Sequence, residues 1–282
     1  MSAPPPPHEV LPASAGDGHR WNVLVRMPAA PRRALLWLPA LGVAARHYLP
    51  FAEALAARDV AVFVHEWRGN GSSTLRPSRA SDWGYRQLLC EDLPASHVAL
   101  ARHTALPLTL GGHSLGGQLA CCYAALHPQA AAQLWLVASG TPYWRCFAPP
   151  RRYLLPLAYR FLAWLAQRQG VLHGRRLGFG STEARSLIAD WARVGLSNRY
   201  AAAGLAVDLE ALLAQLQVPA RGVLLRDDWM APEASLRALL RKLASPSQLH
   251  VLDAAQLGTA ADHFAWMKQP AAVVQALLGA EH

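Results

Sequence analysis

The chain has 282 residues, of which 52% are hydrophobic and 16% are charged. This composition excludes an intrinsically disordered chain and supports a buried core, and the length allows one large domain or two small ones. The 27 Lys and Arg residues outnumber the 18 Asp and Glu residues, which gives a formal charge of +9. The candidate partners of such a basic chain are nucleic acid, an anionic membrane surface and an acidic substrate.

The N-terminus and the cysteines favour a cytoplasmic protein. Residues 1–18 lack the basic and apolar regions of a signal peptide, and the prolines at 4–7 predict a Pro-rich, disordered tail. No stretch of 18 apolar residues avoids charge, so no membrane span is expected. The cysteines have neither C-x-x-C nor zinc spacing; they are Cys90, Cys121, Cys122 and Cys146. We therefore expect reduced thiols, no metal site and a cytoplasmic location.

Residues 19–142 alternate between short apolar runs and longer helical patterns. The runs at 21–27, 34–38, 60–65, 106–110 and 134–138 predict strands, and the patterns at 51–58, 88–103 and 115–126 predict helices. Such alternation is typical of an α/β fold with a mainly parallel sheet. These residues are therefore expected to form the first part of a sheet domain.

The pattern changes in residues 143–215. Helices are expected at 151–169, 183–194 and 208–217, with a Gly-rich link at 170–180 and no strand between them. Alternation then resumes in residues 216–282, with strands at 221–225 and 248–252 and helices at 232–243 and 270–278. The chain thus predicts one sheet domain in two parts, with residues 143–215 inserted as a helical cap.

The most informative motif is the G-x-S-x-G run Gly112-His113-Ser114-Leu115-Gly116. It follows an expected strand and opens an expected helix, which is the setting of a nucleophile elbow. Small neighbours let the backbone turn sharply, so that the hydroxyl stands exposed near the positive end of the helix. Ser114 is therefore the candidate nucleophile; the alternative is a Gly-rich turn with an incidental serine.

With this motif, the chain resembles the α/β-hydrolase superfamily, especially the branch of monoacylglycerol lipases and serine-aminopeptidase-like hydrolases. Residues 66–72, Glu-Trp-Arg-Gly-Asn-Gly-Ser, are similar to the family's D-x-R-G-x-G-x-S loop. Asp228 stands four residues before Pro232, and His263 follows Asp262 near the end. The resemblance extends from about residue 20 to the C-terminus. It implies an α/β-hydrolase fold with a helical cap and serine hydrolase activity, but it identifies no substrate.

A serine hydroxyl needs a base to take its proton and a carboxylate to orient that base. His263 lies between the last expected strand and helix, and it fits the family's order of serine, acid and histidine. The resemblance favours Asp228 as the acid, because of its spacing to Pro232. Asp227 and a carboxylate elsewhere in the chain remain alternatives. His113 is expected to pack or to form hydrogen bonds near Ser114 rather than to act as the base.

Two backbone N–H groups are expected to hold the oxyanion. One is that of Leu115, directly after the nucleophile, and by resemblance the other is that of Leu41. The chain departs from the family's H-G-x-G loop, because Pro39 and Ala40 replace its first two residues. Because the glycine is lost, we expect either a changed shape of this loop or attenuated activity. Asp262 also stands where the family often has glycine.

The insertion is rich in aromatic residues, which favours an apolar pocket for an acyl chain. Trp144, and Trp229 and Trp266 beside the expected acid and base, are candidate substrate contacts, with core packing as the alternative. Residues 143–215 hold ten arginines and four acids, a balance that disfavours amine substrates. We expect a carboxylesterase or lipase-like serine hydrolase acting on neutral or anionic acyl esters. An acyltransferase and a non-catalytic binding or scaffold protein remain alternatives.

The insertion also carries +6 of the net charge of +9. The sheet portion therefore needs no polyanionic partner, and no nucleic-acid partner is expected. The partner is a small-molecule acyl ester, with weak contact between the Arg-rich cap and an anionic membrane surface; a solvated basic surface is the alternative. No nucleotide-binding motif occurs, so no cofactor is expected.

Overall fold

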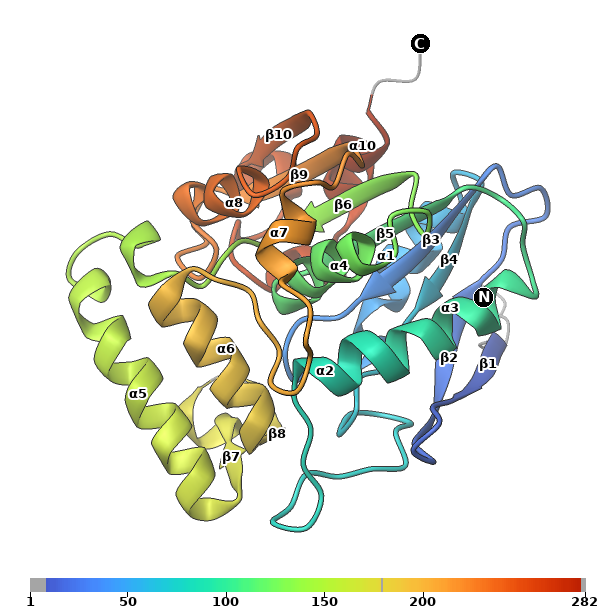
Figure 1. Ribbon diagram of the computed structural model, residues 1–282. Coiled ribbons are helices and arrows are strands. Elements are labelled where there is room, and N and C mark those ends of the chain that lie inside the picture. The colour runs from blue at the N-terminus through green and yellow to red at the C-terminus, as the bar shows by residue number, and fades with distance from the viewer. Residues whose placement is uncertain (1–8, 179, 280–282) are drawn as a thin grey trace.

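The computed structural model describes residues 9–178 and 180–279, and within them eight strands form one twisted sheet (Figure 1). In spatial order the strands are β1 (Glu9–Ser14), β2 (Arg20–Arg26), β4 (Val60–Val64), β3 (Arg33–Leu38), β5 (Leu108–His113), β6 (Gln133–Val137), β9 (Ala220–Leu225) and β10 (Ser247–Leu252). The β1–β2 and β2–β4 pairs are antiparallel and the remaining neighbours are parallel. The mainly parallel sheet that the sequence predicts is confirmed.

Helices cover both faces of this sheet because its strands alternate their side chains between two cores. In β3, Leu35 and Trp37 pack with α1 (Leu49–Ala56) and α10 (Ala271–Leu278). Leu36 and Leu38 join the opposite core. That core contains the side chains of α3 (Leu93–Ala101), α4 (Leu115–Leu126), α7 (Leu209–Leu213) and α8 (Glu233–Leu240). Two short helices, α2 (Tyr85–Gln87) and α9 (Ala254–Leu257), precede α3 and follow β10.

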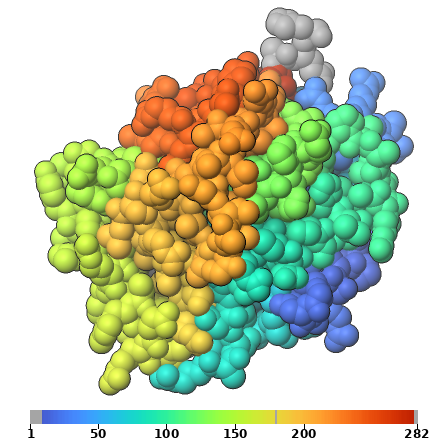
Figure 2. All heavy atoms as spheres, in the orientation of Figure 1, coloured from blue at the N-terminus to red at the C-terminus, as the bar shows by residue number. Residues whose placement is uncertain are grey.

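After β6 the chain leaves the sheet and forms a lobe beside it (Figures 1 and 2). This lobe contains α5 (Arg151–Gln169) and α6 (Arg185–Ser197), which pack together. The expectation of no strand here is wrong, because β7 (Val171–His173) and β8 (Thr182–Ala184) form an antiparallel hairpin. Strands of three residues are too short to show a period in the sequence. The third expected helix, α7, packs on α4 of the sheet domain instead of on the lobe.

The expectation of a disordered tail over residues 1–18 is wrong for β1, while residues 1–8 lie outside the described chain. β1 pairs with β2 along its whole length. Leu11 and Ala13 alternate with exposed neighbours and enter the core. Pro12 is tolerated because β1 is an edge strand, where the missing N–H leaves no ladder bond unmade.

No helix in the described residues is long and apolar enough to cross a membrane.

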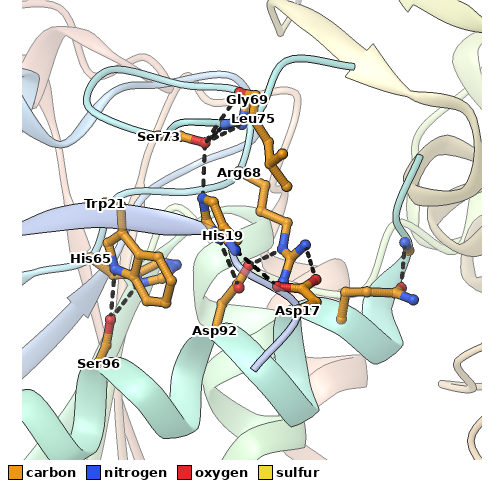
Figure 3. A network of polar contacts seen from close by, with 12 residues as sticks. Asp17, His19, Trp21, His65, Arg68, Gly69, Ser73, Leu75, Asp92 and Ser96 are labelled. Carbon is orange, nitrogen blue, oxygen red and sulfur yellow. Dashed lines mark hydrogen bonds and ion pairs between the residues drawn. The ribbon is translucent and has the colours of Figure 1, made fainter. Parts of the chain in front are cut away.

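A buried polar network ties the start of β2 to the loop that follows β4 and to the turn before α3 (Figure 3). The Asp92 carboxylate lies 3.0 Å from Nδ1 of His19 and accepts a 2.7 Å bond from Nε of Arg68. Arg68 also donates to Asp17 at 2.6 Å, and Nε2 of His19 lies 2.9 Å from Oγ of Ser73. Since Arg68 and Asp92 are both buried, each charge depends on the other for compensation.

Replacing Asp92 by alanine is expected to lower the free energy of unfolding by about 3–5 kcal/mol, because the Arg68 guanidinium would stay buried without its main counter-charge. Urea denaturation followed by circular dichroism measures this change. Asp17→Ala is the matched control: Asp17 is 40% exposed, so its removal should cost about 1 kcal/mol or less. Equal costs for the two variants would show that burial of the Arg68–Asp92 pair does not set its strength.

Candidate active site

Ser114 occupies a sharp turn between β5 and α4, with φ 54° and ψ −120°. Few non-glycine residues adopt this left-handed region, and such strain is typical of functional sites. The two motif glycines permit the turn: a Cβ on Gly112 would lie 2.2 Å from the carbonyl carbon of Gly116, and one on Gly116 would lie 2.0 Å from the Leu38 oxygen. Oγ of Ser139 donates a 2.7 Å bond to the Ser114 carbonyl and braces the turn.

A buried carboxylate–imidazole pair lies at the carboxyl end of the sheet. Nδ1 of His263 is 2.7 Å from Oδ2 of Asp228, and both residues are less than 5% exposed. The other Asp228 oxygen accepts bonds from the backbone N–H groups of Met230 and Ala231. The carboxylate is therefore fixed in orientation and supplied with donors, while the neighbouring Asp227 is exposed.

The surroundings of His263 are aromatic. The His113 ring centroid lies 4.7 Å from that of His263. Burial and the nearby His263 hold the pKa of His113 well below its ordinary value, so His113 stays neutral. Asp262, which replaces the family's glycine, accepts bonds from the N–H groups of Phe264 and Ala265 and thereby shapes the backbone after His263.

Ser114 and His263 line two adjoining cavities. The first, of about 300 Å³, contains Ser114 and has mainly apolar walls, and the second contains His263 and Asp228. Trp229 and Met230 line both. The structure thus gathers the elbow and the carboxylate–imidazole pair at one end of the sheet.

Of the three tryptophans expected to contact substrate, Trp229 alone lines the apolar cavity within the described residues. Trp266 is wrongly assigned: it is fully buried among Trp37, Phe51 and Tyr48, and its Nε1 donates to the His263 carbonyl. Trp144 is half-buried, lines neither of these two cavities and lies with its ring centroid 4.9 Å from the Arg145 guanidinium, so its contact with substrate stays a prediction. Trp266 shows that closeness in sequence to His263 does not decide which way a side chain points.

The loop after β3, expected to hold the oxyanion, is anchored by buried side chains that the sequence did not single out. Nε1 of Trp67 donates a 2.8 Å bond to the Pro39 carbonyl, and the Ala40 N–H donates a 2.8 Å bond to Oη of Tyr48. Oη of Tyr48 also lies 2.8 Å from Nδ1 of His113. Burial raises the pKa of Tyr48 well above its usual value, so the phenol keeps its proton for His113.

The hydrogen bonds of this loop leave the backbone N–H of Leu41 free to act as a donor. Because Tyr48 accepts the Ala40 N–H, that group is engaged, whereas the Leu41 N–H has no partner in the described part of the chain. Leu115 is the first residue of α4, where a helix leaves N–H groups unsatisfied. Leu41 and Leu115 therefore remain the predicted oxyanion donors.

The insertion holds the same loop from the other side. Leu41 packs against the cluster of Ala166, Leu172 and Ile188 inside the lobe. Gly42 has φ 70°, and a Cβ there would lie 2.3 Å from the backbone nitrogen of Ser181. This close approach requires glycine at position 42. The loop is therefore packed between the sheet domain and the lobe.

Comparison with known proteins gives the family. Residues 29–255 match the model of a hydrolase family described as serine aminopeptidase, S33. The chain belongs to this family. Its expected membership of the α/β hydrolases is thereby confirmed, and the family supports a hydrolase activity. Comparison with curated protein sequences finds none that matches.

Solved structures agree on the fold. A hydrolase from Pseudomonas aeruginosa PA01 is similar with a TM-score of 0.65 and 18% identity, over 98% of both chains. A thermophilic esterase from Thermogutta terrifontis gives 0.64 and 18% over 96% of both chains. The esterase domain of a Rhodothermus marinus protein gives 0.63 and 18%, over 97% of this chain and 96% of that one. At such identity the likeness shows the α/β-hydrolase fold alone.

Tyr48→Phe is expected to slow the labelling of Ser114 by a fluorophosphonate about tenfold or more, because it leaves the Ala40 N–H unpaired and frees the loop. Labelling rates measured by intact-protein mass spectrometry test this. Tyr153→Phe is the control, since Tyr153 is 66% exposed. An unchanged labelling rate in a variant whose thermal midpoint has fallen would mean that Tyr48 supports the fold without positioning the loop.

Proposed function

We propose that this chain is a serine hydrolase of carboxylic esters, in which Ser114, His263 and Asp228 form a catalytic triad. The observation that carries the proposal is the buried 2.7 Å bond between Asp228 and His263, close to a serine in a strained elbow beside an apolar cavity. Such a carboxylate fixes the tautomer and orientation of the histidine base.

The proposed reaction begins when Nε2 of His263 takes the proton of Ser114. Oγ of Ser114 then bonds to the carbonyl carbon, and the N–H groups of Leu41 and Leu115 stabilise the oxygen that gains negative charge. His263 passes the proton to the alkoxide as the ester C–O bond breaks, so that an alcohol leaves. Water, deprotonated by His263, next attacks the acyl-enzyme and releases the acid and the free serine.

An ester fits this site better than a peptide with a free amine. Holding an ammonium group needs a carboxylate, and none lines the apolar cavity among the described residues. The four acids of the insertion are engaged elsewhere. Glu183 accepts the Ser181 N–H, Asp190 accepts the Tyr85 N–H, and Glu210 pairs with Lys242. Asp208 caps the start of α7. The apolar walls suit an acyl chain.

Anionic esters are supported by a third cavity, of about 490 Å³, beside the loop of Leu41. Arg46, Arg76 and Arg175 line it from three separate segments, and none of them has an ion pair within the described residues. The nearby Glu66 is buried, its oxygens accept the backbone N–H groups of Ala45 and Ser72, and its charge offsets part of the charge of Arg46 and Arg76. A negative group on the leaving alcohol would meet favourable charge here.

Fluorophosphonate labelling and hydrolysis of a nitrophenyl ester series of increasing chain length test the proposal together. We expect one adduct, on Ser114, and turnover with an optimum set by the 300 Å³ cavity. An adduct without ester turnover would favour an acyltransferase. No adduct in folded protein would favour a non-catalytic binding or scaffold protein.

Substitutions in the proposed triad should separate the two aspartates. Ser114→Ala and His263→Ala are expected to abolish ester turnover, and Asp228→Asn to reduce kcat by about 10⁴-fold, because the amide favours the wrong tautomer. Asp227→Asn is the matched control and should stay close to the parent, since Asp227 is exposed. A crippled Asp227→Asn with an active Asp228→Asn would overturn the assignment of the acid.

We also propose that the outer face of α5 rests on an anionic lipid surface. Five large apolar side chains there are each more than half exposed: Tyr153, Leu154, Leu157, Phe161 and Trp164. Four of them fall at i, i+4, i+8 and i+11, on one side of the helix. Arg160 and Arg168 lie beside this stripe on the exposed surface, which is the pairing of apolar and basic groups that suits an anionic interface.

The double variant Leu157→Ser and Phe161→Ser is expected to lose co-sedimentation with vesicles of phosphatidylglycerol and phosphatidylcholine, because it removes the apolar anchor. The parent should bind these vesicles more weakly at higher ionic strength and bind pure phosphatidylcholine less. Val98→Ser, at an apolar residue of α3 that is 54% exposed, is the control. If vesicle binding were unchanged both by higher ionic strength and by the double substitution, α5 would be excluded as the contact surface.

A further inference from the structure

Besides Ser114 and the half-exposed indole of Trp229, one buried polar side chain in the described chain lines the apolar cavity with a free hydrogen-bonding group. Gln118 lies on α4, four residues after Ser114, and is 4% exposed, yet it borders the cavity. The hydroxyl of Tyr159, another lining residue, donates to the Pro142 carbonyl and is engaged. The remaining lining side chains in the described chain are apolar or contribute carbon surface, as Leu155, Leu162 and Trp191 do.

The Gln118 amide is held on one side only. Oη of Tyr200, a side chain that is 1% exposed, donates a 3.3 Å bond to Oε1 of Gln118. Nε2 of Gln118 has no partner among the described residues. The amide therefore presents its N–H groups to the open space of the cavity. A substrate that covers this donor without offering an acceptor loses free energy, because the donor then has neither water nor protein as a partner.

From this geometry we infer that Gln118 selects acyl groups that carry a neutral oxygen acceptor, an oxo or hydroxyl group, along the chain. The inference rests on the proposed function, in which the acyl chain enters this cavity. A neutral acceptor fits because no basic side chain lines the described walls, so an anionic group would be desolvated there without compensation. An alkyl chain would leave the Gln118 donor unpaired.

Ser114 and Gln118 line the same apolar cavity, so an acyl chain bonded to Ser114 and seated in this cavity passes the Gln118 amide. Ser114 itself precedes α4 in a left-handed turn, so the acceptor is placed by the shared cavity and not by helix spacing. An oxygen within a short acyl chain, beyond the reacting carbonyl, is therefore the group to test.

Binding to the Ser114→Ala protein tests the inference without turnover. Isothermal titration with methyl 5-oxohexanoate and methyl hexanoate compares two chains that differ by an oxo group in place of two hydrogens. We expect the oxo ester to bind about five- to tenfold more tightly, and the preference to vanish when Gln118→Leu is added. Gln118→Met provides the same comparison if the leucine variant folds poorly, and Gln129→Leu, at an exposed glutamine, should retain the preference.

Equal binding of the two esters, absence of binding by both, or a preference that survives the Gln118 substitutions would overturn the inference. Hydrolysis of nitrophenyl esters by the parent protein is scored separately. An oxo preference in the Ser114→Ala protein, alongside a parent that hydrolyses no ester, would defeat the proposed function and leave the Gln118 subsite standing. Ester hydrolysis without an oxo preference would do the reverse.

Discussion

The close approach of α4 to the end of β3 is the constraint on which the site depends. Because Gly116 has no side chain, the first turn of α4 lies against the Leu38 carbonyl. This contact brings the elbow at Ser114 and the loop of Leu41 to the same end of the sheet. Strain at Ser114 is maintained because β5 and α4 are both fully packed around it.

The loop after β3 shows how a departure from a family motif is compensated. Pro39 and Ala40 give up glycine's freedom, but Trp67 and Tyr48 hold their backbone groups with two buried bonds. Trp67 immediately precedes Arg68, which Asp92 fixes from the turn before α3. The loop's position thus depends on hydrogen bonds that run outward through the sheet domain, as well as on the lobe that packs against Leu41.

The sheet could be predicted because its buried strands are short continuous apolar runs, such as β4, which are typical of a mainly parallel sheet. β1 was missed because prolines dominate its sequence neighbourhood. Ser114 could be found from a local motif, and Asp228 and His263 from their spacing to neighbours and family order. The contacts of Tyr48 and Gln118 could not be predicted this way, because they join segments far apart in the chain. Trp266 shows the converse error of inferring a side chain's direction from a neighbour in sequence.

One helix, α5, carries arginines of the basic insertion and also forms part of the wall of the apolar cavity. Leu155 and Leu162 line the cavity from the inner face of α5, while Leu157 and Phe161 are exposed on its outer face. Because these faces lie on opposite sides of the same helix, a substitution on the outer face alters the exposed surface without reshaping the cavity. The proposed surface contact and the proposed acyl selection can therefore be tested separately, although residues of a single helix enter both proposals.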